Sequence, residues 1–183
     1  MKKIKLLILD IDGVMTDGTK EYDKDHNVLS KKFLCKDFTA IKRFSAAGIK
    51  VVLLSGDSWN RTMAEKRQLP FFCTRDENLS LDKSIYIDKF ESMFGIDRDE
   101  MAFVGDDYFD LPMFQSLTCT WCPSDAPDII KNNAKGVLQT KGGEGVIVDL
   151  YDWFIGQNYI TQEASMKEVL ELDKQELTSV EMK

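Results

Sequence analysis

The chain has little of what several common classes of protein depend on. Its 183 residues include one histidine and four cysteines. A structural zinc site needs about four nitrogen or sulfur ligands, and this composition does not supply a convincing set. No apolar run approaches the roughly 20 residues that a membrane-spanning helix requires. We therefore expect neither a fold built around zinc nor a membrane protein.

The cysteines do not form a metal or redox motif. Cys119 and Cys122 make one CxxC, and the sequence has no second pair. In an extended segment, residues three apart point to opposite faces, so these two thiols would not converge on one ion. We expect Cys35, Cys73 and this pair to be buried, reduced thiols.

Positive charge is also scarce, since 24 lysines and arginines stand against 31 aspartates and glutamates. The net charge is −7 and the pI is about 4.8. Nucleic-acid binding needs a basic face, so we expect no nucleic-acid partner. A small anionic substrate remains compatible with this charge if a bound divalent metal offsets the local acid.

What is present fits one soluble domain, with 43% apolar and 30% charged residues. Met1-Lys2-Lys3 looks like the start of a signal peptide, but Asp10 and Asp12 interrupt the apolar stretch that follows, and no cleavage site is seen. We expect a first strand there and a cytoplasmic protein. Residues 1–158 should form the domain, and 159–183 a polar C-terminal tail that is helical, disordered or docked on a partner.

Short apolar runs alternate with segments of helical periodicity. The predicted strands are 5–9, 49–54, 71–73, 101–104, 119–122 and a short one near Val137. The predicted helices are 37–47 with Asp37 as N-cap, about 58–66, 81–94 with Ser80 as N-cap and Lys83 in the first turn, 109–117, one after Ser124, and 145–154. This alternation predicts an α/β fold with a doubly wound, Rossmann-like parallel sheet.

Residues from about Gly18 to Phe33 break that alternation. They contain two short extended arms around the polar tip 23–27, which includes His26 as an expected solvent-exposed turn residue. We expect a small β-hairpin inserted after the first strand.

Acidic residues follow three of the predicted strands. Asp10 and Asp12 follow the first, Ser55-Gly56-Asp57 the second, and Gly105-Asp106-Asp107 the strand at 101–104. Parallel strands end at the same edge of a sheet, which is where open α/β sheets bind ligands. Asp10 can attack phosphorus as a nucleophile, and Asp12 can serve as general acid and base. The pattern predicts a site that hydrolyses phosphate esters.

The remaining groups that such a reaction needs are also present. Gathered carboxylates repel one another unless a cation lies among them, and Mg²⁺ suits oxygen ligands and a phosphate. We expect Asp106 to bind it directly and Asp107 to be a ligand or to orient one. The Ser55 hydroxyl, the Gly56 backbone N–H and the Lys83 ammonium can bind the phosphoryl group.

Several of these segments resemble the motifs of a known protein family. Residues 10–18, 54–56, Lys83 and 105–107 with 110–112 resemble the four motifs of the haloacid dehalogenase superfamily. The long first motif and the segment 142–145 are similar to its small capless branch, which includes the 3-deoxy-manno-octulosonate 8-phosphate and nonulosonate 9-phosphate phosphatases. The resemblance covers roughly residues 4–155.

The resemblance implies specific roles. Asp10 would be the nucleophile that forms an aspartyl phosphate, and Asp12 the acid/base with its backbone carbonyl on Mg²⁺. The metal would be held by Asp10, Asp12, Asp106 and Asp107, and the phosphoryl group by Ser55, Gly56 and Lys83. The resemblance also implies a homotetramer in which hairpins pack together and neighbouring subunits close the site.

Three segments depart from the octulosonate phosphatase pattern. Asp57 and Glu144 stand where that pattern has arginine, and Lys36-Asp37-Phe38 stands where it has Arg-Asp-Gly. Two guanidinium groups that could bind a sugar carboxylate are therefore missing. Lys36, Arg61 or Arg75 could compensate, although a surface role is the more common one for each.

Two other kinds of protein share parts of this pattern. A receiver-like phosphoacceptor module also combines acidic residues, Mg²⁺, a hydroxyl and a lysine on a doubly wound sheet, but its acceptor aspartate follows a middle strand. A structural or regulatory protein could keep this fold without strong catalysis.

Overall fold

The computed structural model describes residues 3–77, 82–161 and 163–181. Within them, six strands form a parallel sheet in the order β5-β4-β1-β6-β7-β8. Their bounds are β1 (Leu6–Leu9), β4 (Lys50–Ser55), β5 (Phe71–Cys73), β6 (Met101–Val104), β7 (Thr120–Cys122) and β8 (Gly136–Val137). The chain starts in the middle and winds out to each edge in turn, so the predicted doubly wound fold is confirmed.

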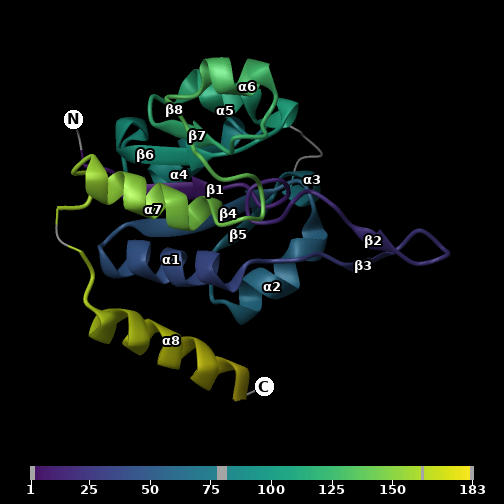
Figure 1. The fold of residues 1–183 in the computed structure, drawn as a ribbon, viewed down its shortest axis with the longest axis horizontal. Coiled ribbons are helices and arrows are strands. Elements are labelled where there is room, and N and C mark those ends of the chain that lie inside the picture. Colours follow the sequence, from purple (N-terminus) through teal and green to yellow (C-terminus); the bar gives the residue numbers. More distant parts are fainter. Residues whose placement is uncertain (1–2, 78–81, 162, 182–183) are drawn as a thin grey trace.

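Helices cover both faces of the sheet (Figure 1). One face carries α1 (Cys35–Ala46) and α7 (Val146–Gly156), and the other carries α4 (Ile85–Phe94), α5 (Leu111–Ser116) and α6 (Asp128–Asn133). Two shorter helices, α2 (Arg61–Lys66) and α3 (Thr74–Glu77), follow β4 and β5, and α8 (Met166–Glu181) ends the described chain. None of these described helices is both long enough and apolar enough to cross a bilayer.

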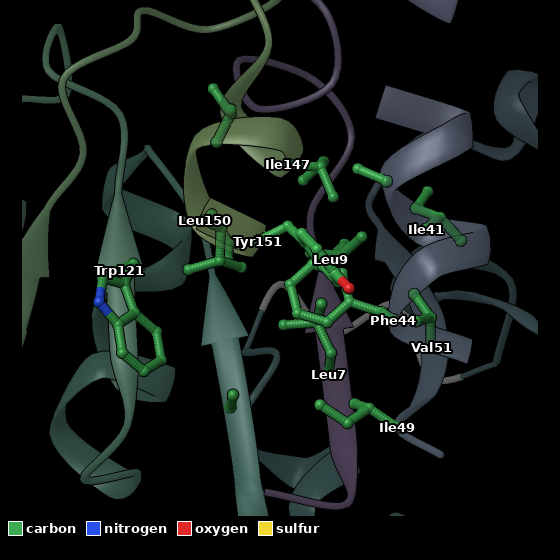
Figure 2. Close-up of a cluster of buried hydrophobic side chains, with 14 of the residues drawn as sticks. Leu7, Leu9, Ile41, Phe44, Ile49, Val51, Trp121, Ile147, Leu150 and Tyr151 are labelled. Atoms are coloured by element: carbon green, nitrogen blue, oxygen red, sulfur yellow. The ribbon is translucent and has the colours of Figure 1, made fainter. Parts of the chain in front are cut away.

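The central strand β1 explains why both faces need cover. All four of its residues are buried, and they alternate between two apolar clusters. Leu7 and Leu9 pack with Phe44 and Tyr151 on the face shown in Figure 2, where these two rings meet edge to face at 5.0 Å. Because each fully buried leucine stabilises the fold by about 1.5–3 kcal/mol, β1 fixes the position of its own carboxyl end firmly.

The register of the sheet brings three strand ends together. Leu9 is paired with Leu53 on β4 and with Val104 on β6. The Asp10 backbone N–H then donates to the Val104 carbonyl at 2.9 Å. The segments that follow β1, β4 and β6 therefore emerge side by side, as the sequence predicted.

The predicted hairpin is also present. Strands β2 (Glu21–Tyr22) and β3 (Val28–Ser30) pair antiparallel and project away from the sheet (Figure 1). His26 is exposed at the tip and stacks on Tyr22 with ring centroids 4.4 Å apart.

Asp37 does not cap the helix that the sequence suggested. Helix α1 begins earlier, at Cys35, which is exposed and so also corrects the expectation of a buried thiol. The Asp37 carboxylate instead accepts hydrogen bonds from the backbone N–H groups of Ile147 and Val148, at 3.0 and 3.2 Å. Burial raises the pKa of Asp37 to about 6, although these two donors act in the opposite direction. The prediction was wrong because the free N–H groups belong to α7, 110 residues further along the chain.

Lys83 also lies outside the helix that was predicted to carry it. Helix α4 begins at Ile85, so Lys83 sits in the preceding turn and not in a first helical turn. The Asp82 carboxylate accepts from the Ser84 backbone N–H at 2.8 Å and shapes that turn. The predicted cap Ser80 lies outside the described residues.

The polar C-terminal segment forms a helix. α8 lies along α1 and α2 (Figure 1), and its own residue Val169 is buried. Glu176 forms ion pairs with Lys42 at 2.9 Å and with Arg67 at 2.7 Å. Of the options left open by the sequence, the described part of the tail takes the helical one, and the boundary near residue 158 stays a prediction.

Candidate active site

A cavity of about 380 Å³ lies at the carboxyl ends of β1, β4 and β6. All seven residues predicted to form the site line it. Among the described residues, the lining is Asp10, Asp12, Gly18, Lys20, Ser55, Gly56, Asp57, Thr74, Arg75, Lys83, Asp106, Asp107, Phe109 and Asp110.

Asp10 is buried beside a lysine and a further carboxylate. The Lys83 ammonium lies 2.8 Å from Asp10 Oδ1 and 2.6 Å from Asp110 Oδ1. The net effect of its surroundings is to raise the pKa of Asp10 to about 7. Burial is the largest cause and raises this pKa, Lys83 lowers it, and Asp110 raises it. Burial alone would lower the pKa of Lys83, but the two carboxylates outweigh burial and raise it above its ordinary value. The lysine is therefore a fixed positive charge against the expected nucleophile.

Three carboxylates gather around one point, as a hard divalent metal ion would require. One oxygen from each of Asp10, Asp106 and Asp110 can be chosen so that all lie within 4.8 Å of one another. The Asp106 Oδ1 atom is buried and has no hydrogen-bond partner among the described residues. Burial and then the charges of Asp10 and Asp110 raise the pKa of Asp106 to about 8. A bound cation would relieve this repulsion and give Asp106 its missing partner, so the residues fit Mg²⁺.

Asp110 is the member of this cluster that the sequence interpretation did not assign to the site. Its Oδ2 atom accepts from the backbone N–H groups of Asp106 and Asp107, at 2.9 and 3.1 Å. Asp107 is exposed, and its own carboxylate accepts from the Tyr108 N–H at 2.6 Å. Asp110 thus shapes the loop after β6 and also pairs with Lys83. Its position one turn after Gly105-Asp106-Asp107 was the available signal.

Glycine is required at the point where the loop after β1 meets the loop after β6. At Gly13 φ is +89°, and a Cβ atom there would lie 2.0 Å from Asp106 Oδ2. Both conditions exclude larger residues, so Gly13 lets the two acidic loops approach each other closely.

Ser55 and Gly56 lie at the end of β4 as predicted. Ser55 is buried, and its hydroxyl oxygen accepts from the Asp57 backbone N–H at 3.1 Å and from the Asn60 amide at 3.2 Å. The hydroxyl hydrogen remains available to a phosphoryl oxygen in the cavity.

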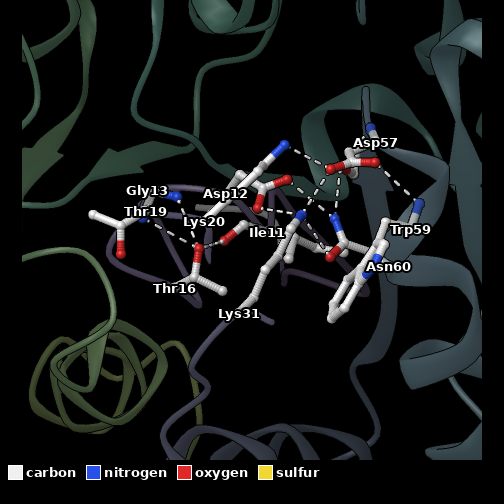
Figure 3. Close-up of polar contacts among 12 residues, drawn as sticks. Ile11, Asp12, Gly13, Thr16, Thr19, Lys20, Lys31, Asp57, Trp59 and Asn60 are labelled. Carbon is white, nitrogen blue, oxygen red and sulfur yellow. Dashed lines mark hydrogen bonds and ion pairs between the residues drawn. The ribbon is translucent and has the colours of Figure 1, made fainter. Parts of the chain in front are cut away.

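Asp12 has a different environment from Asp10, and Figure 3 shows the partners of Asp12. Its Oδ1 atom accepts from Lys31 at 2.6 Å, and its Oδ2 atom from Asn60 at 3.1 Å. Asp57 accepts from Lys31 at 2.9 Å and from Lys20 at 2.7 Å. The hairpin therefore supplies two lysines, Lys20 and Lys31, to the acidic residues of the site. The sequence interpretation assigned no role to either lysine or to Asn60.

The residues considered as replacements for the missing arginines differ in place. Arg75 lines the cavity, whereas Arg61 pairs with Asp76 at the surface. Lys36 is exposed on α1, and Glu144 is exposed and does not line the cavity. Of the three candidate cations, Arg75 is the one that lines the cavity.

Comparisons with known proteins agree with this geometry. The family model for haloacid dehalogenase-like hydrolases matches residues 77–150. The 3-deoxy-D-manno-octulosonate 8-phosphate phosphatase of Haemophilus influenzae is 31% identical over 164 residues, which cover 85% of this chain and 84% of that protein. These values establish the relationship over most of both chains.

Two solved structures extend the comparison. The cobalt-bound form of the Haemophilus influenzae enzyme has a TM-score of 0.78 at 30% identity, covering 92% of this chain and 97% of that chain. The Moraxella catarrhalis enzyme, solved with a magnesium ion, a phosphate ion and a KDO molecule, has a TM-score of 0.75 at 20% identity, covering 86% and 90%, and supports the fold. The acidic cluster and the cobalt-bound relative fit the divalent-metal dependence expected from the sequence. The chain belongs to the haloacid dehalogenase-like hydrolases, among the phosphatases of that family.

Proposed function

We propose that this protein is a Mg²⁺-dependent phosphomonoesterase that acts on a phosphorylated sugar or sugar acid through an aspartyl phosphate on Asp10. The observation that carries the proposal is the Asp10 environment. One of its oxygens is 2.8 Å from Lys83, and its carboxylate belongs to a cluster that fits a divalent ion. This arrangement neutralises an attacking carboxylate and an incoming phosphoryl group together.

Each of the seven predicted site residues has a proposed task in this reaction. Asp10 attacks phosphorus while Ser55, the Gly56 N–H and Lys83 bind the phosphoryl oxygens. Asp12 gives a proton to the leaving oxygen and later takes one from the water that hydrolyses the aspartyl phosphate. Asp10, Asp106 and the Asp12 backbone carbonyl would hold Mg²⁺, with Asp107 as a ligand or an orienting group. When bound, the ion supplies positive charge to the transferring group.

The substrate class rests on relatives and on the cavity. Similar proteins carry the name 3-deoxy-D-manno-octulosonate 8-phosphate phosphatase, whose substrate is a phosphorylated sugar acid. Arg75 lines the cavity and supplies positive charge for a substrate anion. Asp57 and Glu144 stand in place of arginine, so we include nonulosonate 9-phosphates and neutral sugar phosphates in the proposed class.

A phosphate-release screen tests the proposal. Sugar acid phosphates, monosaccharide phosphates, nucleotides and p-nitrophenyl phosphate would be offered with and without Mg²⁺. We expect turnover that requires the metal and disappears in Asp10→Asn. Asp10→Asn with wild-type turnover would show that another group is the nucleophile.

The sheet order argues against the receiver-like alternative. In chain order the strands lie 3-2-1-4-5-6, whereas receiver domains use 2-1-3-4-5. Asp10 follows the first strand in the chain, where a receiver has its acidic pair and not its acceptor. A phosphoprotein stable for minutes, without steady release of phosphate, would favour the alternative.

We also propose a homotetramer, which the family resemblance implies. Tyr22 and Leu29 are exposed apolar residues on the projecting hairpin, and Leu29 is 61% exposed. Contacts between hairpins would cover them. Light scattering after size-exclusion chromatography should give four chains for the wild type and fewer for Leu29→Glu.

A further inference from the structure

The Asp12 carboxylate is held at both oxygens by side chains that do not line the cavity (Figure 3). Lys31 Nζ donates to Oδ1 at 2.6 Å, and Asn60 Nδ2 donates to Oδ2 at 3.1 Å. Lys31 follows β3 of the hairpin, and Asn60 lies in the turn after β4. Two segments distant in sequence therefore converge on one carboxylate.

Lys31 is arranged to act through Asp12 and not on a ligand. An ammonium has three N–H donors, and each has an acceptor here: Asp12 at 2.6 Å, Asp57 at 2.9 Å and Asn60 Oδ1 at 3.0 Å. The Trp59 ring lies 5.4 Å from the same nitrogen. The Lys31 side chain has an exposed fraction of 0%. A buried charge with every donor satisfied holds its partners in place and cannot reach a substrate.

Asp57 anchors this arrangement. Its Oδ2 atom accepts from both Lys31 and Lys20, and its Oδ1 atom accepts from the Trp59 backbone N–H at 3.0 Å. Burial alone would raise the pKa of Asp57, but the two lysines outweigh burial and hold that pKa well below its usual range. The carboxylate at position 57 is thus neutralised by the hairpin and does not confront a substrate anion as an unpaired charge.

We infer that Lys31 and Asn60 are positioning residues that fix Asp12 for proton transfer. This inference rests on the proposed function, in which Asp12 is the acid and base. As the Asp10–phosphorus bond forms and the ester P–O bond breaks, the Asp12 proton moves to the leaving oxygen. The carboxylate that remains accepts the hydrogen bonds of Lys31 and Asn60. Lys31 itself neither gains nor loses a proton.

The test compares two leaving groups in Lys31→Met. The ratio kcat/KM for the best sugar phosphate from the screen should fall roughly 10- to 100-fold, which is part of the 10²- to 10⁴-fold that proton transfer typically contributes. The ratio for p-nitrophenyl phosphate should fall less than about threefold, because p-nitrophenolate departs without a proton. kcat/KM includes only steps up to the first irreversible one, so the later attack of water does not obscure the comparison.

Lys32→Met is the matched control. Lys32 is the next residue, is exposed and loses the same charge, so both ratios should stay at wild-type values. Asp12→Asn removes the acid itself, so it should give the largest loss of kcat/KM that is confined to the sugar phosphate. Asp57→Asn keeps an oxygen for the Trp59 N–H and removes the charge that anchors Lys31, so it should give a smaller loss of the same selective kind. This second variant decides the matter if Lys31→Met does not fold.

Two results would overturn the inference. An equal loss on both esters would mean that Lys31 only supports the fold. No loss on the sugar phosphate would mean that Lys31 is not needed to position Asp12. A gain would mean that Lys31 restrains Asp12 away from its reacting position. Failure of the proposed function would look different, because the wild type would then hydrolyse neither ester or Asp10→Asn would keep its turnover, and both proposals would fall together.

Discussion

Asp10 and Asp12 stand two residues apart and line the same cavity, yet their surroundings differ. Asp10 lies on what we call the interior side of the site, where Lys83 forms ion pairs with both Asp10 and Asp110. Asp12 lies in the hairpin side, with Lys31 and Asn60. The interior side gathers carboxylates around one lysine, whereas the hairpin side alternates lysines with carboxylates.

This difference separates two tasks that one site must perform. Excess negative charge on the interior side attracts a divalent cation. Burial, and after it the neighbouring carboxylates, raise the pKa of Asp106 there to about 8. On the hairpin side Asp12 and Asp57 already have lysine partners, so that side holds its geometry without a metal. Substitutions on one side at a time can therefore separate the two tasks.

Lys83→Met should have the largest effect. It would leave the buried carboxylates of Asp10 and Asp110 without their cation, and breaking a buried pair typically costs about 3–5 kcal/mol in the free energy of unfolding. Loss of a charge at the transferring phosphoryl group should reduce kcat/KM by about 100- to 1000-fold. Urea unfolding and steady-state kinetics measure the two effects. A loss confined to the sugar phosphate would contradict this assignment, because Lys83 should serve every ester alike.

Asp110→Asn should weaken metal binding. The amide oxygen can still accept from the Asp106 and Asp107 N–H groups, but the charge in the cluster is lost. We expect the Mg²⁺ concentration for half-maximal activity to rise about 10- to 100-fold. Asp107→Asn is the comparison, and we expect a smaller rise because that side chain is exposed and bonds its own turn. Equal rises would show that Asp107 matters to the metal as much as Asp110.

Asp57→Asn tests the hairpin side through pH. The lysines hold the pKa of Asp57 below its usual range, so its contribution to stability is present at neutral pH and is lost as the pH falls. We expect the variant to be less stable by about 1–2 kcal/mol at pH 7, a modest value because the side chain is 23% exposed. The difference should shrink below about pH 5. Urea unfolding at several pH values measures it, and a constant difference down to pH 3 would contradict the ion-pair explanation.

The same division limits what the sequence could reveal. Asp10, Ser55 and Asp106 follow apolar runs that read as buried strands, and the end of a parallel strand is predictable from local pattern. Lys31 and Asn60 have no such signal, because a lysine on a hairpin and an asparagine in a turn are ordinary surface residues. Their role depends on how the hairpin folds back over the sheet.

The two misplaced residues, Asp37 and Lys83, have a related cause. Asp37 was assigned to the nearest helix, but its acceptor oxygen serves α7, which a pattern search along the chain cannot detect. Lys83 was placed inside a helix because Ser80 was assigned as the N-cap, while the Asp82 side chain shapes a turn before Ile85 instead. In each case a side-chain hydrogen bond decided the local structure.

Lys24→Met, at the hairpin tip, should have the smallest effect on activity and stability. It tests whether the positioning role extends beyond Lys31 to the tip of the hairpin. Lys24 lies 4.0 Å from Asp25, with side chains 91% and 69% exposed, and such surface pairs contribute little because water screens them. Lys31 differs from Lys24 in burial and in number of partners, not in charge. We therefore expect no measurable change in kcat/KM or in the urea midpoint for Lys24→Met. A selective loss on the sugar phosphate would extend the positioning role to the whole hairpin and would require coupling between its tip and Asp12.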